Sequence, residues 1–133
     1  MRARTIAIVA GIAGGLGWLA KIAVMAVQDG PDPDSIPEAV AFFVGLLGVM
    51  IAAAATGAYL ARERPPVWRV GAAIGAVVAT GVVIGAGQWA LGSLPGDGWL
   101  QEEAIFGLVG LVALAAALLA LRGRPERTAA LES

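Results

Sequence analysis

Long apolar segments alternate with short polar linkers along the whole chain. Four apolar segments lie at about 5–27, 36–61, 70–91 and 100–121. Each has about the twenty residues that a helix needs to cross a hydrocarbon core of roughly 30 Å. Whole turns, such as Val49 to Ala55, contain no polar side chain, whereas a soluble amphipathic helix needs polar residues at helical period. The pattern therefore predicts an all-α membrane protein, with four transmembrane helices in an up-down bundle.

The first linker is dense in residues that end helices. Three prolines between residues 28 and 37 prevent a continuous helix through it. Ser35 followed three residues later by Glu38, with Pro37 near the first turn, is a capping-box pattern. The second apolar segment is therefore predicted to begin close to Ser35.

The later linkers are short. Pro65 and Pro66 interrupt the linker 62–69, so the second and third segments are predicted to form a tight antiparallel hairpin. The loop 92–98 returns the chain for the fourth segment. We expect one domain over residues 1–122 and a short polar cytoplasmic tail over 123–133.

Composition agrees with a membrane location and narrows the chemistry. Hydrophobic residues make up 59% of the chain, charged residues 14%, and the mean hydropathy is +0.81. The sequence has no Cys and no His, which excludes thiolate nucleophiles, zinc sites of the Cys/His type and imidazole acid–base catalysis. Glu102 and Glu103 are adjacent, so they point apart on a helix and do not form a catalytic carboxylate pair. We expect no enzyme activity, no cofactor, no metal and no nucleic-acid partner.

Charge distribution predicts the orientation. Acidic stretches at 29–38 and 97–103 alternate with three basic clusters, which are Arg2/Arg4, Arg62/Arg64/Arg69 and Arg122/Arg124/Arg127. Cytoplasmic loops of membrane proteins carry the excess of Lys and Arg. Both termini are therefore predicted to be cytoplasmic, in a multi-pass protein of the cytoplasmic membrane. A cleaved signal peptide is the alternative for the first segment, but its apolar stretch exceeds the usual 7–15 residues.

The two halves of the chain resemble each other. The segment Glu38–Leu46 aligns with Glu103–Leu111 at an offset of 65 residues. The preceding helices share the spacing i, i+4, i+7, in Gly14/Trp18/Lys21 and in Gly81/Gly85/Gln88. This similarity predicts two parallel helical-hairpin repeats, related by an axis along the membrane normal. The alternative is a chance alignment of helices that are all rich in Ala, Gly, Val and Leu.

Most of the nineteen glycines lie inside the apolar segments, where small residues let helix backbones approach closely. The residues predicted to pack helices are Gly11, Gly15, Gly48, Gly71, Gly75, Gly81 and Gly85. Packing inside a compact bundle is the favoured interpretation. The alternative is a face that dimerises or docks on another membrane protein.

Lys21 is the one charge well inside a predicted span, about 7–8 Å outward from the middle of its segment. It is interpreted first as a snorkelling side chain, or as a structural ion pair with Glu38, Glu102 or Glu103. The second interpretation is an outward-facing polar pocket built from Lys21, Gln88, Glu38 and Glu103. Both Glu38 and Glu103 also stand near helix starts, where a carboxylate favours the helix dipole.

Two threonines inside the spans, Thr56 and Thr80, are expected to hydrogen-bond back to their own helices. Such bonds satisfy a hydroxyl group inside a membrane without any partner helix or ligand. Neither threonine is therefore interpreted as part of a binding site.

Three functions are compatible with these features. The first is a non-catalytic accessory or assembly partner of a larger membrane complex, in contact with the lipid bilayer and with other membrane proteins. The second is a small transporter or channel, acting as a homo-oligomer through the polar pocket around Lys21. A membrane enzyme that acts on lipid is disfavoured, because the usual acid–base side chains are missing.

Overall fold

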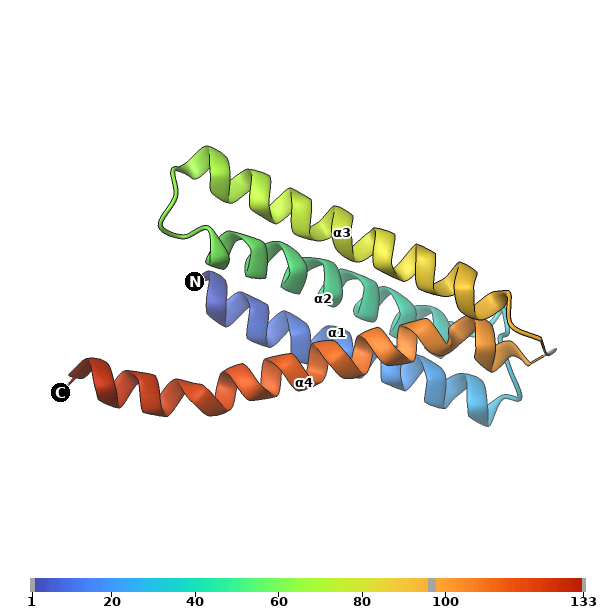
Figure 1. The fold of residues 1–133 in the computed structure, drawn as a ribbon. Coiled ribbons are helices and arrows are strands. Elements are labelled where there is room, and N and C mark those ends of the chain that lie inside the picture. The colour runs from blue at the N-terminus through green and yellow to red at the C-terminus, as the bar shows by residue number, and fades with distance from the viewer. Residues whose placement is uncertain (1, 96–97, 133) are drawn as a thin grey trace.

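A computed structural model describes residues 2–95 and 98–132, and the side chains of these residues except 102 and 123–132. The described chain is all-α, with α1 (Ala3–Val27), α2 (Ile36–Leu60), α3 (Pro66–Gly92) and α4 (Trp99–Glu132) in up-and-down order (Figure 1). Each helix contains a stretch long and apolar enough to cross a membrane. The predicted all-α fold with four such helices is confirmed.

Two helix bounds differ from the predicted ones by more than two residues. Helix α3 begins at Pro66, four residues before the predicted start at residue 70, because proline fits the first turn of a helix. Helix α4 continues to Glu132, although the fourth segment was predicted to end at residue 121 and to be followed by a tail. The residues after 121 include Gly123 and Pro125, which disfavour a helix, so residue propensity alone does not explain this continuation.

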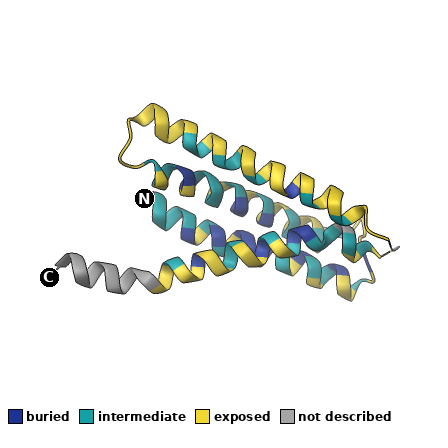
Figure 2. Cartoon of the chain, viewed as in Figure 1, coloured by how far each residue is buried: buried dark blue, intermediate teal, exposed yellow. Residues whose placement is uncertain are grey.

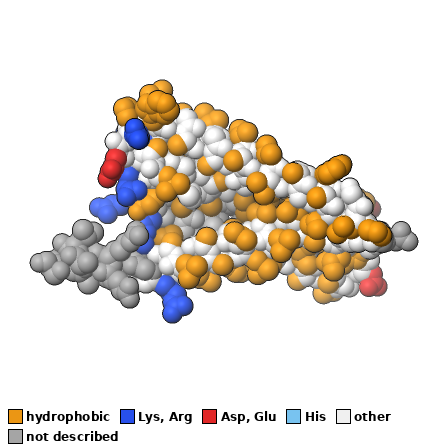
Figure 3. Space-filling model, in the orientation of Figure 1, with side chains coloured by type: hydrophobic (Ala, Val, Ile, Leu, Met, Phe, Trp, Pro, Cys, Tyr) orange, Lys and Arg blue, Asp and Glu red, His pale blue; other side chains and the backbone are white. Residues whose placement is uncertain are grey.

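The two ends of the bundle carry opposite charge. One end of the bundle, which we call the arginine end, contains the N-terminus of α1, the α2–α3 linker and Arg122 (Figures 1 and 3). The α1–α2 and α3–α4 linkers lie at the other, which we call the acidic end. Among the described side chains, the arginine end carries six arginines and Glu63. The described members of the charge clusters thus gather at two opposite ends of one bundle.

Helix α1 is the central element and packs against both α2 and α4, whereas α3 lies at the edge and packs mainly against α2 (Figure 2). Ile84 is the one buried residue of α3, all of whose residues are described. The core cluster lies near the acidic end and consists of Trp18, Val49, Ile84, Ile105 and Phe106. The bundle is therefore held together chiefly through α1.

Glycines make the close contacts of α1. A Cβ atom added at Gly14 would lie 2.5 Å from the backbone N of Val49, and one at Gly48 would lie 2.5 Å from the Cα of Gly14. On the α4 side, a Cβ at Gly15 would lie 2.7 Å from the carbonyl oxygen of Gly110, and one at Gly11 would lie 3.2 Å from the Cβ of Ala117. Gly11, Gly15 and Gly48 thus lie where α1 approaches α2 and α4 closely.

The prediction of internal packing is wrong for the four α3 glycines that the sequence singled out. A Cβ added at any of them would meet nothing within 4 Å, and all four are exposed: Gly71, Gly75, Gly81 and Gly85. Helix α3 instead faces the bundle with Ala72, which crowds Gly57 of α2, and with Gly87, which accommodates Ile105 of α4. At 3.6 residues per turn, these inward positions lie on the opposite side of the helix from the four glycines.

Candidate functional site at the acidic end

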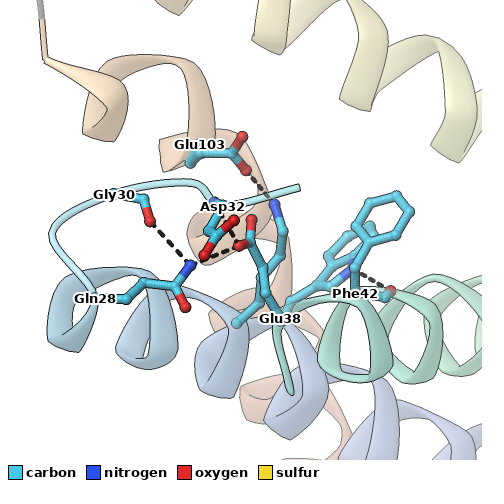
Figure 4. A network of polar contacts seen from close by, with 8 residues as sticks. Gln28, Gly30, Asp32, Glu38, Phe42 and Glu103 are labelled. Atoms are coloured by element: carbon cyan, nitrogen blue, oxygen red, sulfur yellow. Dashed lines mark hydrogen bonds and ion pairs between the residues drawn. The ribbon is translucent and has the colours of Figure 1, made fainter. Parts of the chain in front are cut away.

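Lys21 forms a buried ion pair with Glu103. Lys21 lies on α1 six residues before the helix ends at Val27, or about 9 Å from that end. It is 6% exposed, and its Nζ donates to Oε2 of Glu103, a residue near the start of α4 (Figure 4). A lysine inside a membrane helix is unfavourable by roughly 2.5–3.5 kcal/mol on insertion scales, so a carboxylate partner is expected. The predicted ion pair is present, with Glu103 as its acidic member.

Aromatic rings surround this ion pair. The ammonium of Lys21 lies 4.6 Å from the ring centroid of Phe106 and 5.3 Å from that of Phe42, both within the range of cation–π attraction. Trp18 packs edge-on against Phe106, with centroids 5.0 Å apart. Its indole Nε1 donates to the carbonyl oxygen of Phe42 at 3.1 Å. Trp18, Phe42 and Phe106, here called the aromatic cluster, thus connect α1, α2 and α4 around the charge.

Two glycines make room for the aromatic cluster. A Cβ at Gly45 would lie 1.9 Å from Cδ1 of Trp18, and one at Gly110 would lie 3.3 Å from the Cβ of Trp18. The indole is 0% exposed as a result. Neither glycine belongs to the residues predicted to pack helices, because nothing in a single sequence shows which glycine faces a tryptophan on another helix.

Glu38 belongs to a different network. The backbone N–H of Glu38 donates to Oγ of Ser35 at 3.3 Å, which confirms the predicted cap of α2. The carboxylate of Glu38 accepts from Nε2 of Gln28 at 2.6 Å and from the backbone N–H of Asp32 at 2.9 Å (Figure 4). Glu38 therefore fastens the first linker to the start of α2.

The turn after α1 completes this second network. Asp29 and Gly30 have φ angles of 62° and 122°, in the region that favours glycine, and the N–H of Gly30 donates to the carbonyl oxygen of Met25 at 2.7 Å. A Cβ at Gly30 would lie 3.1 Å from Cδ1 of Trp99. The first linker thus packs on the first residue of α4. The Gln28-Asp29-Gly30 sequence is a helix-ending signal from which this turn was predictable.

The four predicted site residues do not come together as one group. Lys21 and Glu103 are paired, and Glu38 bonds to the linker. Gln88 is exposed on α3, and no hydrogen bond among the described residues joins it to the other three. The side chain of Glu102 lies outside the described residues. The aromatic cluster was missed, although Trp18 stands three residues before Lys21 and Phe106 three after Glu103, which places each on the same helical face as the charge.

At this site the charge of Lys21 is neutralised by Glu103, and aromatic side chains cover the pair. Among the described residues, no group of three or more Asp and Glu side chains is arranged to hold a metal ion. Comparison of the chain with protein-family models, with characterised proteins and with solved structures found no match. Function is therefore inferred from the geometry of this chain alone.

Proposed function

We propose that this protein is a non-catalytic, multi-pass protein of the cytoplasmic membrane that assembles into a larger membrane complex through the exposed glycine face of α3. The glycine face consists of Gly71, Gly75, Gly81 and Gly85, and it carries the proposal. In the proposed orientation the arginine end faces the cytoplasm, as the positive-inside rule favours.

The glycine face supports assembly, because contact with lipid alone does not explain why four exposed positions on one side of α3 are glycine. Glycine in the middle of a helix makes the helix less stable than alanine does, by roughly 0.5–1 kcal/mol. Larger apolar residues suit a surface that faces lipid. Small residues become favourable where a second helix approaches closely, since helix association in lipid depends on van der Waals packing. Gly71 and Gly75, and Gly81 and Gly85, stand four residues apart and share one side of α3.

The transporter alternative has less support. The charge of Lys21 is neutralised by Glu103 and covered by the aromatic cluster, and Gln88 is exposed on α3. A conducting or substrate-binding pocket needs polar groups that converge on an accessible space. Transport that is abolished by Lys21→Met, in a variant shown by circular dichroism and gel filtration to be folded, would favour this alternative over assembly.

Purification from the native membrane in mild detergent tests the proposal. The double variant Gly75→Leu/Gly85→Leu fills the glycine face, and Ala115→Leu, which places a leucine at an exposed position of α4, is the control. We expect wild type and Ala115→Leu to elute with stoichiometric partner proteins, and the double variant to elute alone with its fold intact. A wild-type protein that elutes as a single monodisperse chain contradicts the proposal.

A further inference from the structure

A cavity of about 600 Å³ opens between the four helices in the half of the bundle near the arginine end. Helices α3 and α4 touch near the acidic end through Gly87 and Ile105 and diverge toward the arginine end (Figure 1). A second cavity of about 420 Å³ lies between α3 and α4 and shares Thr80, Val109 and Val112 with the first. The two cavities therefore adjoin and form one groove within the membrane-spanning part.

The larger cavity has the length of one membrane leaflet. Along α4 it is lined from Val109 to Ala120, a distance of eleven residues. At 1.5 Å per residue this is about 16 Å, close to half of a hydrocarbon core of roughly 30 Å. An acyl chain that enters from the arginine end would reach the middle of the bilayer within this groove.

The walls of the cavity are chemically apolar. Thr56 and Thr80 line it, but their hydroxyl groups donate to the carbonyl oxygens of Ala52 and Ala76 in their own helices, at 2.7 and 2.8 Å, as expected from the sequence. Apart from Arg4 and Tyr59 at the mouth, the remaining lining residues are Ala, Gly, Val, Ile and Leu. Such walls suit a hydrocarbon chain. They offer an ion no polar groups that could replace its hydration shell.

Two guanidinium groups stand at the mouth. Arg4 lines the cavity, and its Nη2 donates to the carbonyl oxygen of Ala120 at 2.8 Å, which holds the guanidinium between α1 and α4. Tyr59 also lines the cavity, and the guanidinium of Arg62 lies 4.2 Å from the centroid of its ring. Figure 3 shows basic side chains gathered at this end of the molecule. Arginine suits phosphate because its planar fork donates two parallel hydrogen bonds.

We propose that this groove binds one acyl chain of an anionic phospholipid from the leaflet at the arginine end, with the lipid phosphate held by Arg4 and Arg62. The inference goes beyond assembly, because it concerns the groove between α3 and α4 and not the glycine face on the opposite side of α3. Apolar walls of one-leaflet length and a basic mouth are together what such a lipid requires.

Native mass spectrometry of the detergent-purified wild-type chain tests the inference. The probe is an equimolar mixture of palmitoyl-oleoyl phosphatidylglycerol and palmitoyl-oleoyl phosphatidylcholine. The two lipids share their acyl chains and the phosphate, but the choline ammonium makes phosphatidylcholine neutral overall, whereas phosphatidylglycerol is anionic. We expect one phosphatidylglycerol per chain, retained about tenfold more than phosphatidylcholine, because the guanidinium groups attract the net negative charge of phosphatidylglycerol and repel the choline ammonium. Equal retention of the two lipids overturns the proposal.

Two pairs of variants test the acyl-chain groove and the headgroup contact of the proposed lipid site separately. Ala116→Phe places a ring in the groove and should abolish retention, whereas Ala115→Phe, next to it but outside the lining, should not. Arg4→Gln should reduce the preference for phosphatidylglycerol about threefold, because Arg62 remains, whereas Arg2→Gln, which does not line the cavity, should preserve it. Circular dichroism and gel filtration verify that each variant is folded.

Three further outcomes contradict the proposal. Equal retention by Ala116→Phe and Ala115→Phe would place the lipid elsewhere. Displacement of phosphatidylglycerol by millimolar inorganic phosphate would show an anion site that does not use the acyl chain. A dimer of the chain that excludes the lipid would show that a second copy fills the groove.

Discussion

Lys21 of α1 and Glu103 of α4, 82 residues apart in the chain, form an ion pair among the rings of Phe42 and Phe106. The pair joins the central helix to the last one close to the acidic end. Both charges are largely removed from water, so each is stable there only while the other neutralises it. The pair therefore stabilises the contact between α1 and α4.

Removal of either member of the ion pair should destabilise the bundle. Lys21→Met leaves Glu103 unpaired and Glu103→Gln leaves Lys21 unpaired, and loss of one partner of a buried pair typically lowers the free energy of unfolding by about 3 kcal/mol. The double variant Lys21→Met/Glu103→Gln should recover most of this loss, because no uncompensated charge remains. Unfolding in mixed micelles of increasing SDS fraction measures all three. Single variants as stable as wild type would show that the pair does not stabilise the contact between α1 and α4.

Two glycine-to-alanine changes should have opposite effects. Gly45→Ala places a Cβ where Trp18 lies, 1.9 Å from its Cδ1, so the indole must move and the protein should lose about 1–3 kcal/mol. Gly75→Ala meets open space on the glycine face and should stabilise the isolated chain by roughly 0.5–1 kcal/mol through helix propensity. Thermal unfolding in detergent compares them. A Gly45→Ala protein as stable as Gly75→Ala would contradict the packing described around Trp18.

Loss of the Glu38 carboxylate should loosen the first linker while leaving the bundle intact. Glu38→Ala removes the acceptor for the side chain of Gln28 and for the N–H of Asp32. We expect hydrogen exchange at Asp32 to accelerate about fivefold, which corresponds to roughly 1 kcal/mol for a partly exposed bond. Asp34→Ala, in the same linker, is the control, because the carboxylate of Asp34 takes no part in the hydrogen bonds found among the described residues. Unchanged exchange at Asp32 in Glu38→Ala would show that Glu38 does not fasten the linker.

The orientation prediction is testable with single cysteines, since the natural chain has none. Cysteines at Ser35 and Ser93 lie in the linkers of the acidic end and should react with a membrane-impermeant reagent in intact cells. A cysteine at Thr128 should react only after the cells are opened. The reverse labelling pattern would invert the proposed topology.

Segment length, hydropathy and caps were sufficient to predict the four helices, because these features are local to each segment. The start of α2 at Ile36 follows from Ser35 and Glu38 without any tertiary contact. The end of α4 was not predictable in this way, since the apolar segment ends near residue 121 and Gly123 and Pro125 follow it, whereas the helix continues to Glu132.

The contacts between helices were harder to predict, because they depend on how each helix is rotated about its axis. Gly11 and Gly15 on α1 face α4, whereas Gly71 and Gly75 on α3, with the same spacing, face away from the bundle. The same rotation separates Gln88 from Lys21, which had seemed equivalent by position. The ion pair with Glu103 was foreseeable, since an intramembrane lysine needs a carboxylate at its own depth. The proposed repeat stays a prediction, and its aligned residues Glu38 and Glu103 have different partners.

Site-specific photo-crosslinking in the native membrane tests the proposed assembly through α3 most directly. A photoreactive amino acid at Val78, which is 58% exposed and lies among the four glycines, is compared with the same group at Leu111, which is 53% exposed on α4. We predict a discrete protein adduct from position 78 that disappears in the Gly75→Leu/Gly85→Leu background, and no protein adduct from position 111. Absence of an adduct at position 78, or equal adducts at both positions, would contradict assembly through the glycine face.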